Sequence, residues 1–194
     1  MTIGAFHIAA FDLITFVFAF AMFVLGFAQG TIRRVLGIAS MLFSFLFAAN
    51  LRGSFGQYLA ENWTAYLPEY AVMLGFGIVF VAATIAFTLI IQGFYHKQAL
   101  FQKATFADEV IGGILGIIQA FLLIGFVIII LDSFFRIPTV QPFDSEFGWI
   151  RGLFNLINES AVAELFRTRL IPGFIAVFGL LIPGDVQAFY VAVR

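Results

Sequence analysis

Four long stretches without a charged residue constrain this chain more than any other feature of its sequence. They are residues 13–32, 35–51, 70–95 and 110–131. A helix needs about 20 apolar residues to cross the hydrocarbon core of a bilayer, with a range of about 17–25. A helix also satisfies its own backbone hydrogen bonds in lipid. The sequence therefore predicts an all-α polytopic membrane protein, with four transmembrane helices in a domain that covers residues 1–132.

The composition supports a chain that lies mostly in lipid. Of its 194 residues, 62% are hydrophobic and only 11% are charged, whereas soluble domains are about 45–50% apolar and about 25% charged. So few charges cannot cover a soluble surface. The net charge of −1 gives no reason to expect nucleic acid as a partner. Cysteine is absent, which excludes disulfides, thiolate metal sites and a cysteine nucleophile.

Lysine and arginine are unevenly distributed between the two sides of the predicted bundle. One side receives Arg33, Arg34, Lys97 and Lys103, and the other receives Arg52 and Arg136 in its short connections. Because cytoplasmic loops carry the excess of these residues, we expect a bacterial inner-membrane protein with both termini outside. His7 and His96 then lie on opposite sides and cannot share a metal ion. The first span has no basic n-region or cleavage site, so we expect it to remain as a helix.

The segment between the second and third spans has the spacing of an amphipathic helix. Its aromatic residues Tyr58, Trp63 and Tyr66 recur on one face, opposite polar residues. Amphipathic rings are favoured at the level of the lipid headgroups. We therefore predict an interfacial helix near residues 54–67, which ends before Pro68 because proline disfavours a helical conformation in the residue before it.

The last third of the chain, residues 133–194, mixes amphipathic and apolar stretches. Residues 147–158 and 159–170 have apolar faces opposite polar ones, which is typical of helices that lie on a membrane surface. Residues 171–184 are apolar, but at 1.5 Å per residue they reach about 21 Å, short of a hydrocarbon core of about 30 Å. We expect extracytoplasmic amphipathic helices followed by a short re-entrant or interfacial segment.

Small residues recur along each predicted span. The glycines among them that we take as helix-packing candidates are Gly26, Gly30, Gly37, Gly112 and Gly116. Lipid gives helices little hydrophobic drive to associate, so packing depends on small residues that let two backbones approach. We expect these stripes to pack the bundle, with contact to a second copy or to another membrane protein as the alternative use. The expected partners are thus the lipid bilayer and a homo-oligomer or membrane-protein partner.

Polar residues at the ends of the spans are candidates for a specific role. Asp12 and Asp132 fall at the outer ends of spans one and four, as interfacial ion pairs or, alternatively, as a small polar mouth. Asp108 begins span four on the inner side, at the depth of Arg33 and Arg34. Their shared depth and opposite charge motivate the hypothesis of a salt bridge from Asp108 to one of these arginines.

Gln119 is a strongly polar side chain near the middle of span four. A hydrogen bond between helices is its expected role, and lining a pore is the alternative. The sequence contains no Gly-x-Ser-x-Gly elbow, no His-Glu-x-x-His motif, no Walker loop and no dinucleotide fingerprint. We therefore predict that the protein is not an enzyme and that it has no cofactor and no metal site.

Two blocks of the sequence resemble those of a known family. The first is Asp12 followed, eighteen residues later, by the turn Gly30-Thr31-Ile32-Arg33-Arg34. The second runs from Asp108-Glu109 through Gly112, Gly116, Gln119 and Ala120 to Leu131-Asp132. They are similar to the opening Asp and the Gly-Phe-x-Arg-Glu turn, and to the Asp-Arg-x-x-Gly-x-x-x-Gly-x-x-Arg-Gly helix ending in Leu-Asp, of the colicin V production protein (CvpA) family.

The sequence departs from that family pattern at a few positions. Thr31 and Arg34 replace the usual aromatic residue and Glu, while Gln119 and Ala120 replace Arg and Gly. The resemblance covers roughly residues 12–132 and implies four spans with both termini outside. It also implies a part in the production or export of colicin V and in envelope homeostasis. We expect a non-enzymatic scaffold, with a small channel or transporter, or a membrane subunit of a larger complex, as alternatives.

Overall fold

Four long helices form the body of the protein. The computed structural model describes residues 2–3, 6–7, 9–94, 105–136 and 146–191. A short antiparallel pair of strands, β1 (Thr2–Ile3) and β2 (Phe6–His7), precedes the helices. The long helices are α1 (Ala10–Gln29), α2 (Thr31–Asn62), α3 (Pro68–Phe94) and α4 (Thr105–Phe135), and each contains a stretch that is long and apolar enough to cross a membrane. The predicted all-α class with four spanning helices is confirmed.

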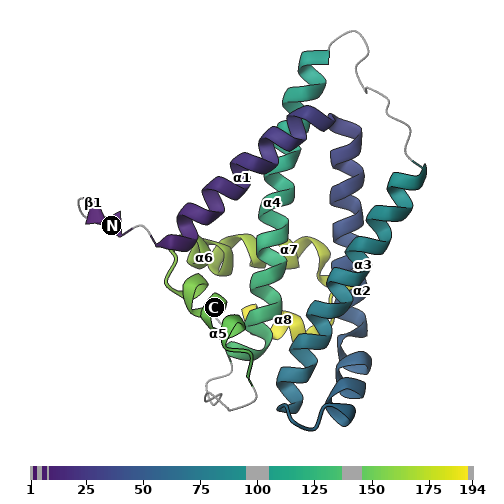
Figure 1. Cartoon of the computed structure of the whole chain (residues 1–194), viewed down its shortest axis with the longest axis vertical. Helices are drawn as coiled ribbons and strands as arrows, with labels where there is room; N and C mark the ends of the chain where they lie inside the picture. Colours follow the sequence, from purple (N-terminus) through teal and green to yellow (C-terminus); the bar gives the residue numbers. More distant parts are fainter. Residues whose placement is uncertain (1, 4–5, 8, 95–104, 137–145, 192–194) are drawn as a thin grey trace.

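The four helices associate as two pairs that meet at α4. The largest interfaces are those of α2 with α3 and of α1 with α4, while α2 and α4 make a smaller one. Figure 1 shows α1 crossing α4 and slanting away from α2. We call the end where α2 and α4 begin the Gly30 end, and the opposite end, where α4 finishes, the Asp132 end. Residues His96, Lys97 and Lys103 lie outside the described residues, as does the side chain of His7.

A single residue connects α1 to α2. Gly30 has a φ of +78°, which lies in the region that residues with a Cβ rarely adopt. A Cβ at this position would also lie 2.6 Å from Oδ2 of Asp108. The sharp reversal therefore requires glycine, and it brings the beginning of α2 against the beginning of α4.

The structure differs from the separate interfacial helix predicted near residues 54–67. Residues 54–62 continue α2 without a break, and the connection to α3 is the short stretch 63–67. The reason is tertiary packing, because a Cβ on Gly56 would lie 2.8 Å from Cα of Val72 in α3. This close approach holds the last turns of α2 against α3 and extends the helical hairpin.

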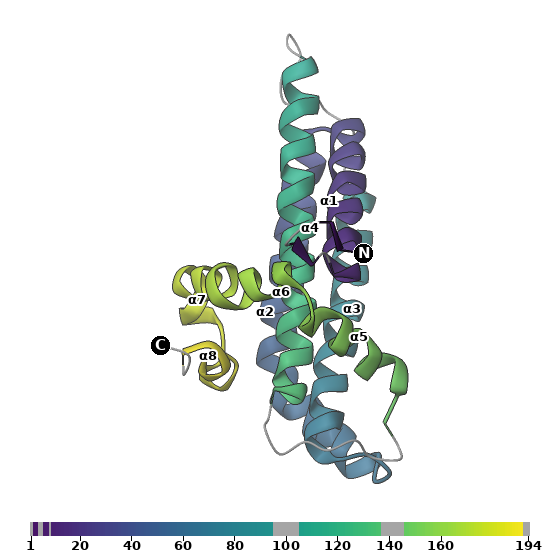
Figure 2. The same cartoon turned by 90° about the vertical axis from the view of Figure 1, so that its left-hand side faces the viewer.

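Short helices cross the long ones in the C-terminal part. They are α5 (Gly148–Asn158), α6 (Ala161–Leu165), the π-helix η1 (Phe166–Leu170), α7 (Ile171–Phe178), the 3-10 helix η2 (Gly179–Leu181) and α8 (Gly184–Val191). Figure 2 shows α7 and α8 on one side of the long helices and α5 on the other. The predicted helices are present, and their place in a membrane leaflet stays a prediction.

Phenylalanine rings join these short helices to the bundle. Phe45 of α2 stacks on Phe126 of α4 with ring centroids 4.0 Å apart, and both are buried. Phe174 of α7 meets Phe126 edge-on at 5.3 Å. Such ring pairs add to the stabilisation that comes from burial alone. The core therefore continues from α2 through α4 into α7.

Candidate functional site: buried polar contacts along α4

Asp132 is fully buried near the end of α4 and joins three elements. Nε of Arg167 in η1 donates to its Oδ2 at 2.9 Å, and Nη2 of the same arginine donates to its Oδ1 at 2.7 Å. The hydroxyl of Tyr190 in α8 donates to Oδ2 at 2.9 Å. Paired, charge-assisted bonds of this kind are among the strongest hydrogen bonds in proteins. Asp132 thus attaches η1 and α8 to the bundle.

Arg167 extends the same cluster to α5. Its Nη1 donates to Oδ1 of Asn158 at 2.9 Å, and its guanidinium carbon lies 5.7 Å from the ring centroid of Phe154. Burial raises the pKa of Tyr190, and the negative charge of Asp132 raises it further. The phenol therefore keeps its proton and acts as a donor to the carboxylate.

Asp12 makes a separate set of contacts at the beginning of α1. Its Oδ2 accepts the backbone N–H of Ala9 at 3.1 Å. Its Oδ1 accepts the hydroxyl of Ser160 and the backbone N–H of Val162, the latter at 3.1 Å. Ser160 in turn accepts the N–H of Ala163 and is the N-cap of α6. Asp12 therefore fastens the first turn of α1 to the beginning of α6.

The sequence placed Asp132 near Arg136 but missed its principal partner. Arg136 Nη1 is 3.8 Å from Oδ2 of Asp132, whereas Arg167 makes the short contacts. Arg52, which the sequence assigns to the same side of the bundle as Arg136, pairs with Asp185 at 2.6 Å. A buried aspartate at the end of a span signals a cation, but that signal does not select one arginine among several.

Glycines let α1 and α4 cross in close contact towards the Gly30 end. A Cβ on Gly116 would collide with the carbonyl oxygen of Met22, and one on Gly26 would collide with the carbonyl oxygen of Gly112. The hydroxyl of Thr31 donates to the backbone oxygen of Asp108 at 3.0 Å. Gly26, Gly112 and Gly116 thus lie where the backbones of α1 and α4 meet.

The hypothesised salt bridge from Asp108 to Arg33 or Arg34 does not form among the described residues. The Gly30 turn instead brings the carboxylate of Asp108 against Gly30, and its Oδ1 is buried without a hydrogen-bond partner. Arg33 is exposed, while Arg34 is directed toward the middle of α4. Shared depth was therefore not enough to predict the pairing.

Arg34 contacts Gln119 across the interface of α2 and α4. Its Nη1 donates to Oε1 of Gln119 at 2.7 Å, and Arg34 is 5% exposed. Gly37 leaves the space that Gln119 needs, because a Cβ there would lie 3.2 Å from its Nε2. Arg34 and Gln119 are two of the positions that depart from the family pattern. The structure brings these two departures into direct contact.

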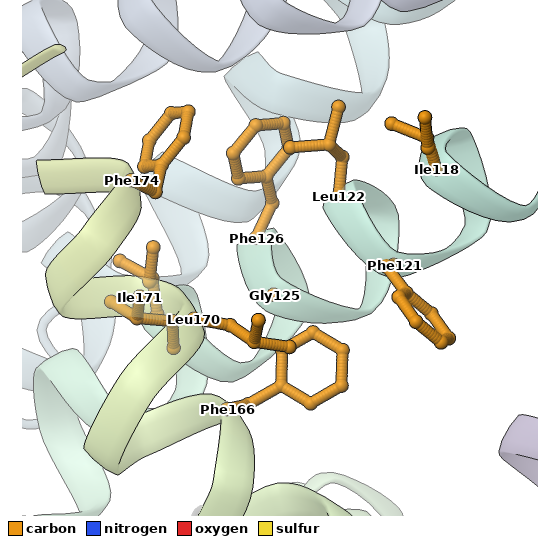
Figure 3. Close-up of a pocket in the computed structure, with 10 residues that line it drawn as sticks. Ile118, Phe121, Leu122, Gly125, Phe126, Phe166, Leu170, Ile171 and Phe174 are labelled. Carbon is orange, nitrogen blue, oxygen red and sulfur yellow. The ribbon is translucent and has the colours of Figure 1, made fainter. Parts of the chain in front are cut away.

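Two apolar spaces lie beside these polar contacts. A cavity of about 190 Å³ separates α4 from η1 and α7, and Figure 3 shows Phe126, Phe166 and Phe174 around it. A groove of about 740 Å³ runs between α3, α4 and α5, with Gly77 and Trp149 among its lining residues. Within the described part of the chain, no group of His, Asp or Glu residues could hold a metal ion. Because their lining residues are apolar, these spaces are suited to hydrocarbon groups.

A comparison with protein families identifies a relationship that covers most of the chain. The family model described as Colicin V production protein matches residues 11–170. Neither a curated protein nor a solved structure matches the chain significantly. The matched range contains Asp12, Asp132 and Arg167, and it ends before Tyr190.

Proposed function

Because the chain belongs to the colicin V production protein family, we propose that it is a non-enzymatic scaffold of the bacterial inner membrane. In this role it binds other envelope proteins and supports toxin production or export and envelope homeostasis. Its multi-pass helices hold it in the bilayer. The termini lie outside, as the distribution of Lys and Arg between the two ends of the bundle favours.

The observation that supports this proposal is that two aspartates attach the short C-terminal helices to the bundle. Asp132 and Asp12 bind Arg167, Tyr190 and Ser160 of the same chain. These contacts build a rigid layer of short helices on the bundle. The layer leaves large apolar side chains exposed, and Trp149 is 70% and Val177 74% exposed. Rigid elements that present apolar side chains are suited to binding a partner.

Photo-crosslinking in native membranes tests the scaffold. A photoreactive amino acid at Trp149 or Val177 should give a defined crosslinked product in cells that make colicin V, and mass spectrometry identifies the partner. Glu61, which is also exposed, provides the control position. If Trp149 and Val177 give only lipid adducts, or the same products as Glu61, the scaffold proposal fails.

A small channel is the second candidate, because Arg34 and Gln119 form a buried polar contact between α2 and α4. Purified protein in liposomes should then carry anions, and Arg34→Gln should reduce the flux. Equal anion flux in liposomes with and without the protein would contradict a channel.

A further inference from the structure

The groove between α3, α4 and α5 has a floor of buried side chains and a rim of exposed ones. Phe80 and Ile150 on the floor are 4% and 5% exposed, whereas Val81 and Ile85 on the rim are 56% and 55% exposed. Apart from the indole N–H of Trp149, the lining side chains carry no hydrogen-bonding group. A ligand for this groove therefore places an apolar part in it, since a polar group there would find no partner.

The groove has the length of one leaflet of a bilayer. On α3 its lining residues run from Met73 to Ile85, which is about 18 Å at 1.5 Å per residue. Half of a hydrocarbon core of about 30 Å is about 15 Å. Met73 lies near the beginning of α3 at the Asp132 end, where Tyr70 contacts Phe134 of α4 with ring centroids 5.0 Å apart. The groove thus runs from one membrane surface to the midplane, as the acyl chain of a lipid does.

Helix α5 closes the groove at the Asp132 end. Phe147, Ile150 and Leu153 line it there, and Figure 2 shows α5 lying at an angle to the long helices. The backbone N–H of Phe147 donates to the hydroxyl of Tyr70 at 3.2 Å, which ties the beginning of α5 to α3. A partner helix that crosses the bilayer needs a path of about 30 Å, and α5 blocks that path. A flexible chain that ends at α5 does not need it.

The charged residues that flank the groove on α5 are paired with each other. Nη2 of Arg151 lies 2.6 Å from Oε2 of Glu146, so neither offers a free charge to a ligand. Trp149 lies between them in the sequence and is 70% exposed, and an indole ring is favoured at the level of the headgroups. The groove therefore recognises the chain of a lipid and does not select the charge of its headgroup.

We propose that this groove binds one acyl chain of a phospholipid from the leaflet at the Asp132 end. The chain lies between α3 and α4 and extends from Trp149 towards Ile85. It occupies the space beside Gly77, where a Cβ would meet Cγ2 of Ile130 at 3.7 Å and no other atom within 4 Å. This lipid site goes beyond the scaffold role and does not depend on it.

The two tryptophans of the chain provide the test. Trp63→Phe leaves Trp149 at the groove, and Trp149→Phe leaves Trp63, which does not line it. Phosphatidylcholine with brominated acyl chains is added to each purified protein in a neutral detergent, because bromine quenches tryptophan fluorescence at short range. Quenching of Trp149 should exceed what the lipid content of the micelle gives and should saturate at one lipid per chain. Trp63 should show only the quenching of the micelle, and brominated phosphatidylglycerol should give the same results.

The position of the bromine tests how the chain lies. Bromine near the ester should quench Trp149 more strongly than bromine near the methyl end, because the methyl end lies towards Ile85. This comparison needs no substitution inside the groove, so it stays decisive if a groove variant does not fold. Equal quenching from both bromine positions, or equal quenching of Trp149 and Trp63, would overturn the proposal.

A side chain placed in the groove should displace the lipid. Gly77→Leu should abolish the saturable quenching of Trp149, while Gly53→Leu, the same change in open space on α2, should keep it. Native mass spectrometry of the unsubstituted protein should find one phospholipid bound. Saturable quenching that persists in Gly77→Leu, or a second copy or another polypeptide bound in place of the lipid, would show that the groove has a different use.

Discussion

At the residue scale, the environment of a charge decides how much its pairing contributes. Asp132 has no exposed surface, and its side-chain oxygens take three hydrogen bonds from other elements. Asp185, the partner of Arg52, has 64% of its side chain exposed. Removing one member of a buried pair leaves an uncompensated charge, whereas an exposed pair is screened by solvent.

Asp132→Ala should therefore destabilise the protein by about 3–5 kcal/mol. Asp185→Ala, the matched control, should cost about 0–1 kcal/mol. Unfolding in mixed micelles, followed by circular dichroism, measures both. The double variant Asp132→Ala/Arg167→Met should cost less than the sum of its single changes, since both charges are then gone. Equal losses for Asp132→Ala and Asp185→Ala would contradict this account.

Tyr190 gives the same cluster a dependence on pH. Burial and the Asp132 carboxylate raise the pKa of Tyr190 above its usual value of about 10. The folded state holds this proton more tightly than the unfolded state, so the stabilisation is complete below about pH 10 and is lost as the pH rises above it. The stability difference between the wild type and Tyr190→Phe should be constant from about pH 6 to 9 and should change only above about 10. A change near neutral pH would exclude this assignment.

The contact between Arg34 and Gln119 predicts how the stability of the bundle responds when the two residue types are changed. The family pattern has Glu at the first position and Arg at the second, and these two positions touch in the structure. Arg34→Glu alone should destabilise the bundle, and Gln119→Arg alone should do so by bringing two cations together. The double variant should recover stability because it places an acid and a base at two positions that are in contact. Thermal unfolding of the three variants measures the coupling, and additive losses would disprove direct contact.

At the element scale, the crossing of α1 and α4 depends on the absence of side chains. Gly116 lies against the carbonyl oxygen of Met22, so Gly116→Ala should push the helices apart and cost about 1–3 kcal/mol. Gly53 in α2 has open space around it, so Gly53→Ala should be neutral or should stabilise by up to about 1 kcal/mol through helix propensity. Unfolding measurements on both compare the same chemical change in two environments.

The sequence predicted the helices well where hydropathy alone determines them. The four spans follow from long charge-free stretches, although the sequence carries the first span to residue 32, whereas α1 ends at Gln29 before the turn at Gly30. The prediction of a separate helix failed at residues 54–62, because aromatic residues at helical spacing made this part resemble an interfacial segment, whereas it continues α2. What extends α2 is the contact of Gly56 with Val72, and local periodicity contains no information about a contact between two helices. The same limit applies to Asp132 and Arg167, which are 35 residues apart.

At the scale of the whole molecule, the orientation in the membrane is open to a direct test. The chain has no cysteine, so single cysteines can be introduced without a background. Glu61→Cys lies towards the Asp132 end and Thr105→Cys at the Gly30 end, and both positions are exposed. With the termini outside, a membrane-impermeant maleimide should label Glu61→Cys in intact cells and Thr105→Cys only after permeabilisation. The reverse pattern would invert the proposed topology.

The separation of Asp132 from its partners sets an order of events during synthesis. The carboxylate emerges from the ribosome 35 residues before Arg167 and 58 before Tyr190. The four long helices are thus made while the end of α4 still carries an unpaired charge, which favours keeping that end near water. The partners of Asp132 belong to η1 and α8, which follow α4 in the sequence. The hydrogen bonds of Asp132 can therefore form only after Arg167 and Tyr190 have been synthesised.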